Sequence, residues 1–301
     1  MKIYYWCPFL TNIATIKSVI KSAKSIKKYS VREKEKTEVT ILNSCGEWDF
    51  LKNNSYNIKI NNLLPINFYK FIPKEGFIQS RFSFLLIFFS NLFPLLFNIK
   101  NHKPKYLIVH LLTLLPIMLS PFLSKNTKII LRISGLPNLT PFRKFIWKTF
   151  SKYIYIITAP TQITYDLLIE SKIFEKNKIK LLRDPIIEYE EIKDKKNIKI
   201  DKNFNNFKFY LSIGRLTEQK NFSFLIKMFS KYNKNFKINK LLIIGEGEEK
   251  YNLLKLIKNN KMENNIFLVG FKKNVYNYIN NCEGLISVAQ YEDPGFVLIE
   301  A

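Results

Sequence analysis

The stretch Phe209-Tyr-Leu-Ser-Ile-Gly-Arg-Leu-Thr-Glu-Gln-Lys-Asn-Phe222 decides the fold of this chain. It begins as a continuous apolar strand, passes Gly214 and a polar loop, and continues in a helical pattern. Such a unit directs the free N–H groups of a helix towards the carboxyl edge of a parallel sheet, where open α/β folds bind ligands. Gly214 allows close backbone approach, and Arg215 and Lys220 add positive charge. The stretch therefore predicts an anion-binding loop on an α/β sheet.

Apolar strands and helical patterns alternate on both sides of this stretch. Downstream, strands are expected at 241–244, 264–270 and 284–288, with helices at 222–232, 248–259 and 275–280. Continuous apolar strands that alternate with helices predict a parallel sheet covered on both faces. Upstream, the same alternation predicts a basic amphipathic helix at 15–28 and strands at 2–6, 38–42, 106–109, 128–133 and 153–157.

The repeated alternation predicts an α/β chain of two Rossmann-like domains with parallel sheets. We expect a first domain over 1–186, a linker over 187–206 and a second domain over 207–301. The linker is assigned because 187–206 is charged and shows no helical pattern. Two domains of this size lie in the usual range.

A second motif closes the chain, Tyr291-Glu-Asp-Pro-Gly-Phe-Val-Leu-Ile-Glu-Ala301. Glu292 and Glu300 flank a Pro-Gly turn, after which Phe296 is expected to begin a buried helix. The N–H groups of that first turn form an anion site, and ionised carboxylates accept several hydrogen bonds from hydroxyl groups. The alternative is an ordinary loop-helix junction, because two glutamates at this spacing also arise by chance.

Together the two motifs resemble the Gly-Arg-Leu…Lys and Glu-x7-Glu signatures of retaining GT-B glycosyltransferases of family 4, also called group 1. The resemblance covers 208–301, and Gly245 and Gly247 are similar to a further Gly-x-Gly-Pro turn, with Glu248 in place of the proline. It implies the GT-B fold with an incomplete second domain, because relatives continue beyond the second glutamate. A fragment is the expected explanation; a truncated gene product is the alternative.

The resemblance implies a metal-independent hexosyltransferase that uses a UDP- or GDP-sugar donor and a lipid-linked surface polysaccharide or oligosaccharide acceptor. The expected catalytic residues are Glu292, which takes hydroxyls of the donor sugar, and Arg215 and Lys220, which hold the diphosphate. Glu300 is expected to bind the ribose. The donor-binding set implied by the motifs is Gly214, Arg215, Lys220, Gly295, Phe296, Val297 and Glu300, and no separate cofactor or metal is expected.

The first half offers fewer candidate residues. The loop 7–14 is expected at an interdomain cleft, but it lacks the glycines of related enzymes, and bulk from Phe9 to Ile13 would crowd a diphosphate. His110 follows a strand, and a lone histidine is more often structural than catalytic. Relatives have a histidine where Ser134 and Gly135 stand; both are candidate cleft residues. In the implied retaining scheme the leaving phosphate itself accepts the acceptor proton.

Two apolar segments raise the question of a membrane. The segment 82–97 contains Asn91 and Pro94 and falls short of the ~20 residues of a confident span, and 111–123 is shorter still. We expect a cytoplasmic protein, peripheral on the inner face of the membrane, whose helix docks partly on its own sheet and partly in the leaflet among lysines. An entirely internal helix is the alternative.

Composition excludes several other classes. The formal net charge is +24, yet the basic residues are scattered, as in products of A/T-rich genes, and no nucleic-acid-binding motif is present. Three cysteines without metal spacing fit a reducing cytoplasm. Other hypotheses are a catalytically inactive GT-B remnant that binds a membrane or a partner, and a GT-B epimerase or phosphorylase.

Overall fold

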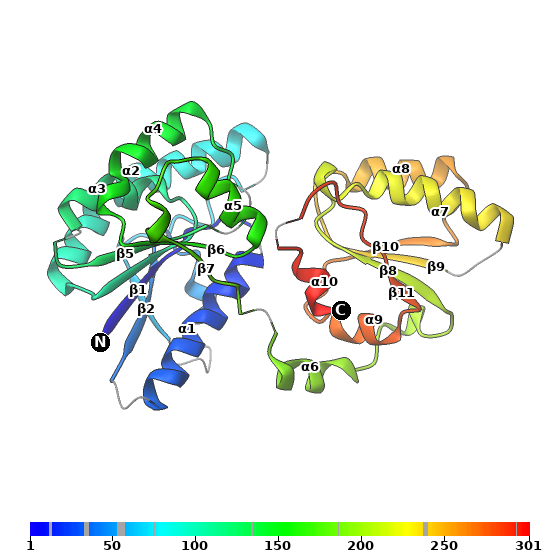
Figure 1. Cartoon of the computed structure of the whole chain (residues 1–301). Coiled ribbons are helices and arrows are strands. Elements are labelled where there is room, and N and C mark those ends of the chain that lie inside the picture. Colours follow the sequence, from blue (N-terminus) through cyan, green and yellow to red (C-terminus); the bar gives the residue numbers. More distant parts are fainter. Residues whose placement is uncertain are drawn as a thin grey trace. The chain divides into compact units, whose positions relative to one another are not determined.

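The structure is a computed structural model of the chain, and it divides into two compact units (Figure 1). The first unit is Met1–Pro185 and the second is Ile186–Ala301. The described residues are 1–11, 14–32, 36–52, 58–74, 76–123, 125–133, 135, 137–185, 187–236, 240–292 and 294–301.

The described part of the first unit contains a seven-stranded sheet in the order β3-β2-β1-β4-β5-β6-β7, and all neighbouring strands are parallel. Because β1 lies between β2 and β4, the strand order reverses beside it, and the carboxyl ends of β1 and β4 form the switch point. The strands are β1 (Lys2–Trp6), β2 (Glu38–Asn43), β3 (Lys59–Asn62), β4 (Tyr106–Val109), β5 (Lys128–Arg132), β6 (Ile156–Ala159) and β7 (Ile179–Leu181).

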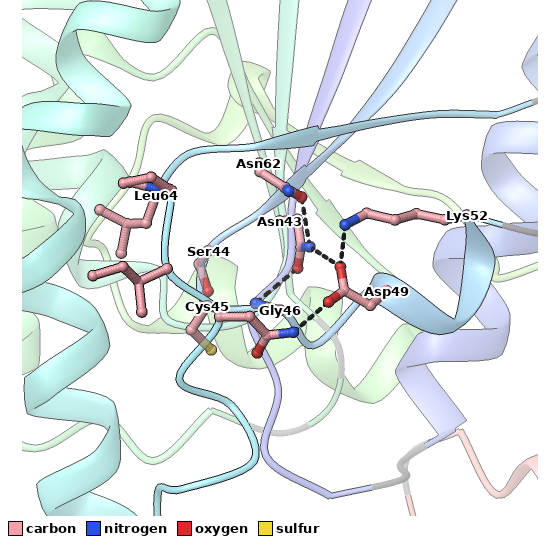
Figure 2. Close-up of a pocket in the computed structure, with 11 residues that line it drawn as sticks. Asn43, Ser44, Cys45, Gly46, Asp49, Lys52, Asn62 and Leu64 are labelled. Atoms are coloured by element: carbon pink, nitrogen blue, oxygen red, sulfur yellow. Dashed lines mark hydrogen bonds and ion pairs between the residues drawn. The ribbon is translucent and has the colours of Figure 1, made fainter.

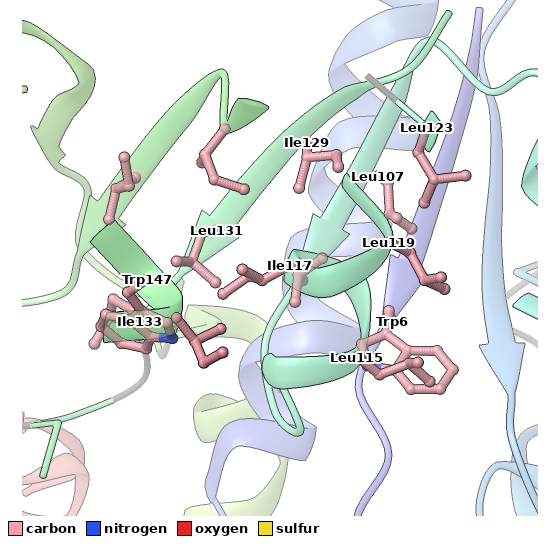
Figure 3. Close-up of a cluster of buried hydrophobic side chains, with 14 of the residues drawn as sticks. Trp6, Leu107, Leu115, Ile117, Leu119, Leu123, Ile129, Leu131, Ile133 and Trp147 are labelled. Atoms are coloured by element: carbon pink, nitrogen blue, oxygen red, sulfur yellow. The ribbon is translucent and has the colours of Figure 1, made fainter. Parts of the chain in front are cut away.

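Helices cover both faces of this sheet, which explains its continuous apolar strands. One face carries α1 (Ala14–Arg32), and the other carries α2 (Phe77–His102), α3 (Leu114–Leu123), α4 (Pro141–Phe150) and α5 (Gln162–Glu170). On the second face the core contains side chains of β1, β4 and β5 packed against α3 and α4, as Figure 3 shows. Trp6, Leu107, Leu115 and Leu131 are completely buried there.

The described part of the second unit contains a four-stranded parallel sheet in the order β10-β9-β8-β11. Its strands are β8 (Phe209–Ile213), β9 (Lys240–Ile244), β10 (Ile266–Gly270) and β11 (Gly284–Leu285). The helices α7 (Phe222–Phe236) and α8 (Lys250–Asn259) cover one face, and α9 (Tyr276–Asn281) packs on the other. The chain therefore has the α/β class and the two parallel sheets that its sequence predicts.

The segment 187–206 differs from the expectation of a linker without helical structure. It contains α6 (Tyr189–Lys196) and a 3₁₀ turn at Lys202–Phe204, and it belongs to the second unit. α6 packs against α9, where the side chain of Asn274 donates to the carbonyl of Lys195 at 3.0 Å. No residue of α6 is buried, so this helix has no apolar stripe that a sequence pattern could detect.

Candidate donor site

Two loops of the second unit meet because of strand order. β8 continues through β9 to β10, and the chain then returns to place β11 on the other side of β8. The loops that follow β8 and β11 therefore leave the sheet side by side at its carboxyl edge, at a topological switch point. These loops carry the two sequence motifs, which are separated by about seventy residues along the chain.

Lys220 and Glu292 meet in an ion pair at this edge. Their side chains are 15% and 26% exposed, so the pair is neither fully solvated nor fully buried. Gln219 ties the same loops together: its side chain donates to the carbonyl of Tyr291 at 3.0 Å, and its own carbonyl accepts from the N–H of Gln290 at 2.9 Å. The structure thus brings one expected phosphate ligand into contact with the expected sugar ligand.

The Gly-x-Gly turn shapes the loop after β8. The N–H of Gly214 donates to the carbonyl of Ile244, and the N–H of Leu216 donates to the carbonyl of Glu246. A Cβ atom at Gly245 would lie 1.8 Å from the carbonyl oxygen of Gly214, and one at Gly247 would lie 2.4 Å from that of Leu216. Only glycine permits this backbone contact.

Arg215 stands apart from this pair. Its residue is exposed, and no ion pair to its guanidinium occurs among the described residues of the chain. The Cβ position of Gly214 lies 3.1 Å from the side chain of Lys220, so the glycine leaves room for that lysine to lie along the loop. The loop therefore presents one exposed cation beside one that is paired with a carboxylate.

Glu300 lies in α10 (Phe296–Glu300), a single turn that Gly295 precedes with a left-handed φ of 70°. Oε1 of Glu300 accepts a hydrogen bond of 3.4 Å from the hydroxyl of Tyr276 in α9. Burial, followed by the negative charges of Glu300 and Glu191, raises the pKa of Tyr276, which keeps this hydroxyl protonated. The expectation of a buried helix is wrong for the described residues, because α10 has no buried residue and Leu298 is 54% exposed.

Glu292 and Glu300 have different partners, and the structure does not join them. Sequence analysis missed Gln219, Gln290 and Tyr276. The two glutamines are adjacent in sequence to the motif residues Lys220 and Tyr291, and this adjacency is the one feature of the sequence that could have indicated them. Tyr276 carries no such signal, because its contact with Glu300 depends on how α9 and α10 pack. The expected roles of Gly295, Phe296 and Val297 in phosphate binding stay predictions.

In the first unit the bulky loop after β1 packs inward. Phe9 is 2% exposed, and its ring meets Trp48 edge to face at 5.0 Å. The ring of Phe9 is therefore buried in its own unit, whereas the expectation that bulk from Phe9 to Ile13 crowds a diphosphate stays a prediction. Asn12, Ile13 and Ser134 lie outside the described residues, whereas Gly135 is described and adopts a φ of 139°.

His110 is buried and neutral. It is 3% exposed, its backbone N–H donates to the backbone carbonyl of Trp6 at 2.9 Å, and its imidazole ring stacks on Tyr5. Burial, with a smaller contribution from the charge of Arg132, lowers the pKa of His110 to about 3. These properties favour the structural interpretation of this histidine, because a base with so low a pKa is protonated only in strong acid.

A small polar pocket of about 60 Å³ lies at the carboxyl ends of β2 and β3 (Figure 2). Its side chains bind one another: the amide of Asn43 donates to both Asp49 and Asn62, and Asp49 also pairs with Lys52. The polar side chains of this pocket therefore pair with one another. Across the described ranges, no three His, Cys, Asp or Glu side chains gather as a metal site requires.

The second unit also matches a known protein family in sequence. Residues 193–301 match the family model described as Glycosyl transferases group 1. An uncharacterized glycosyltransferase of Methanocaldococcus jannaschii is 29% identical over 222 residues, which are 67% of this chain and 54% of the relative. The N-acetylgalactosamine-N,N'-diacetylbacillosaminyl-diphospho-undecaprenol 4-alpha-N-acetylgalactosaminyltransferase of Campylobacter jejuni is 39% identical over 94 residues, 31% of this chain and 25% of that protein.

Among solved structures, HepE of Anabaena in complex with UDP and glucose has a similar fold, with a TM-score of 0.65 and 13% identity. The match covers 100% of this chain and 78% of that one. At such low identity the likeness concerns the fold alone. The chain spans about half the length of the archaeal relative and a quarter of the Campylobacter one.

Proposed function

The chain belongs to the group 1 glycosyl transferases, with the GT-B fold, and we propose that it moves a hexosyl group from a nucleotide-sugar donor to a surface-glycan acceptor that a lipid carries. The observation that carries the proposal is the contact between Lys220 and Glu292 at the carboxyl edge of β8 and β11. An anion ligand and a hydroxyl ligand side by side suit a sugar diphosphate, which offers both groups at adjacent positions.

Donor binding occupies the second unit. Arg215 and Lys220 hold the diphosphate, with the backbone of Gly295, Phe296 and Val297 beside it, and Glu292 accepts hydroxyls of the donor sugar. Glu300 takes the ribose hydroxyls, with its oxygen oriented by Tyr276. HepE of Anabaena, whose fold is similar, was solved with UDP and glucose, which supports a uridine diphosphate sugar as the first donor to test.

The proposed transfer step uses these residues. The acceptor hydroxyl oxygen bonds to the anomeric carbon, the bond from that carbon to the diphosphate breaks, and a diphosphate oxygen takes the acceptor proton. Arg215 and Lys220 stabilise the charge that develops on the departing diphosphate, which is the largest electrostatic demand of the step. No protein base and no metal are required, and the configuration of the anomeric carbon is retained.

The acceptor side rests on the relatives. The Campylobacter protein acts, by its name, on a saccharide attached to diphospho-undecaprenol, which supports a lipid-linked acceptor. The first unit supplies the acceptor contacts in this proposal, and nucleic acid is not a partner.

Calorimetric titration with UDP, GDP and ADP tests the donor site. We expect one nucleotide to bind, and Arg215→Ala to weaken it about tenfold to a hundredfold, because a hydrogen bond to a charged group contributes about 1.5–3 kcal/mol. Glu300→Ala should weaken the nucleoside diphosphate, and Lys255→Ala, an exposed lysine of α8, serves as the control. A folded chain that binds none of the three nucleotides contradicts the donor site.

Transfer is tested separately with the preferred donor and a lipid-linked saccharide, and the product is examined by NMR. An axial product from an axial donor is the expected outcome. Nucleotide binding without any transfer would instead support the inactive remnant, and an inverted product would contradict the retaining step.

A further inference from the structure

The outer surface of the first unit carries an apolar face that no other described part of that unit covers. α2 presents a stripe of apolar side chains away from the sheet, and the adjoining helices α3 and α4 add more. Seven phenylalanines, which we call the aromatic face, are each 57–68% exposed: Phe82, Phe89, Phe93, Phe97, Phe122, Phe142 and Phe145. Figure 1 shows that the three helices that carry them lie on the same side of the sheet.

The size of this face is unusual for a surface that meets only water. A phenylalanine side chain offers roughly 200 Å², so the seven residues, exposed by about two thirds, together present ~900 Å² of aromatic surface over three adjoining helices. The largest apolar patch of an ordinary monomer is about 300–600 Å². A patch of this size indicates a surface that docks on something.

The charge of the segment that carries the aromatic face indicates what this face binds. Between Gly76 and Tyr165 the sequence has no Asp or Glu and has eleven Lys and Arg. A base-composition bias raises Lys and Asn throughout a chain, but it does not remove acidic residues from one segment. This segment contains α2, α3 and α4, so the elements that carry the aromatic face also carry a one-signed charge.

Topology then gathers the lysines at one edge. Helices α2, α3 and α4 end where β4, β5 and β6 begin, so their junctions meet at the amino edge of the sheet. These junctions supply Lys100, Lys103, Lys105, Lys125, Lys128 and Lys152, which we call the lysine edge. Lys100 lies over the ring of Phe122 at 5.8 Å, which joins the lysine edge to the aromatic face.

A shallow depression of about 390 Å³ lies within the lysine edge. Lys128, Lys152 and Lys178 line it together with Tyr153 and Tyr155, and Nζ of Lys128 lies 4.3 Å from the ring of Tyr155. Of these lysines, Lys178 pairs with Glu175 at 3.4 Å, and that carboxylate is itself largely exposed. The depression is therefore positive and open, as a headgroup phosphate requires.

We propose that the aromatic face and the lysine edge dock the first unit on an anionic lipid surface, with α2 lying in the interface and not across the membrane. Apolar rings beside a row of cations are the two features that interfacial binding needs. A second copy of the chain is a poor occupant, because two molecules of net charge +24 repel one another.

The orientation of α2 follows from its inner side. By length and composition α2 is the one helix of the described residues that could cross a membrane. However, Leu95 and Ile99 are buried in the core against the sheet, Ile87 is buried against Leu10 and Cys45, and the amide of Asn91 donates to the carbonyl of Ile87 at 2.9 Å. Insertion across the bilayer would strip this side from the core, so only the outer stripe is free to meet lipid.

Vesicle flotation with the full chain tests the proposal independently of sugar transfer. We expect binding to vesicles of phosphatidylcholine mixed with phosphatidylglycerol, weak binding to phosphatidylcholine alone, and release by high salt, since the Debye length falls from about 10 Å at 0.1 M to about 3 Å at 1 M. The double variant Phe89→Ser with Phe93→Ser should bind at least about tenfold more weakly.

Matched variants keep the test sharp. Phe224→Ser with Tyr251→Ser removes two exposed aromatic side chains from the second unit and should leave binding unchanged. Lys100→Gln with Lys125→Gln should lower binding to anionic vesicles several-fold, whereas Lys255→Gln with Lys258→Gln on α8 should not. All eight substitutions in the four double variants fall on exposed positions, so each protein is expected to fold, which circular dichroism checks.

Several results would overturn the proposal. Equal binding by the Phe89 and Phe93 variant, or no binding to anionic vesicles at all, would remove the aromatic face from membrane docking. Resistance to alkaline carbonate extraction would mean that α2 spans the bilayer. If the chain formed dimers in the absence of lipid, and if the phenylalanine substitutions dissociated them, the aromatic face would be an interface with a second copy.

Discussion

The ion pair between Lys220 and Glu292 predicts an unusual response to mutation. In the free chain Lys220 is bound to a carboxylate, so a diphosphate must compete with Glu292 for this lysine. Replacing Glu292 with glutamine removes that competitor while it keeps the shape of the side chain. We therefore expect Glu292→Gln to bind UDP, without a sugar, more tightly than the wild type.

The magnitude follows from the exposure of the pair. At an effective dielectric constant of about 20, two unit charges about 4 Å apart attract by about 4 kcal/mol. Desolvation and lost side-chain freedom offset most of this, and a pair that is 15% and 26% exposed is expected to retain about 1 kcal/mol. The gain in UDP affinity should therefore be about fivefold.

A double-mutant cycle measured by calorimetry separates this pair from simple repulsion between Glu292 and the phosphates. With Lys220→Ala as the background, Glu292→Gln should gain little, because no lysine remains to be released. The sugar nucleotide should not share the gain, since in the proposed donor site Glu292 also accepts hydroxyls of the donor sugar. Glu263→Gln, an exposed carboxylate before β10, is the charge control. An equal gain with and without Lys220, or weaker UDP binding by Glu292→Gln, would refute the reasoning.

Three further predictions concern the framework of the two units. Gly245→Ala should weaken nucleotide binding and destabilise the second unit by about 1–3 kcal/mol, because its Cβ would lie 1.8 Å from the carbonyl oxygen of Gly214. UDP titration measures the first effect and urea denaturation the second, and unchanged values would contradict the close backbone contact. Asp184→Asn should destabilise the first unit by about 3–5 kcal/mol, because the buried guanidinium of Arg132 loses its charged partner. Asp201→Asn, which breaks a partly exposed pair with Lys272, should cost under about 1 kcal/mol in the same urea experiment. The pKa of His110 is lowered to about 3, so the unfolded chain binds a proton before the folded chain does. The free energy of unfolding should therefore fall as the pH drops from about 6.5 towards 3, by up to about 1.4 kcal/mol per pH unit. The difference in unfolding free energy between wild type and His110→Gln should shrink over this range, and a constant difference would argue against a buried neutral ring.

The buried strands could be predicted from sequence because helices cover both faces of each sheet. β1 and β4 begin and end at the expected residues, since their apolar runs are uninterrupted. β3 was missed because Lys59–Asn62 is a polar edge strand, and α6 was missed because it buries no side chain. Both elements are held by neighbours, so their own residues carry little signal.

The candidate site was predictable only in part for a related reason. The motifs predict which residues bind the donor, but the contact of Lys220 with Glu292 depends on β11 returning beside β8, which no local pattern encodes. The same holds for Tyr276, whose hydroxyl reaches Glu300 only because α9 and α10 lie together. Spacing along the chain indicates chemistry, whereas strand order decides which groups meet.

The distribution of charge along the sequence was informative, whereas the net charge of the chain was misleading. A net charge of +24 spread over the chain suggests base composition and little else. The missing acids between Gly76 and Tyr165 are a different observation, since three apolar helices fall in that segment and their ends meet at one edge of the sheet. If base composition alone set the charge, acidic residues would interrupt this segment as they do the second unit. Their absence is therefore a property of the surface that α2, α3 and α4 present, and vesicles of controlled charge are the direct way to measure it.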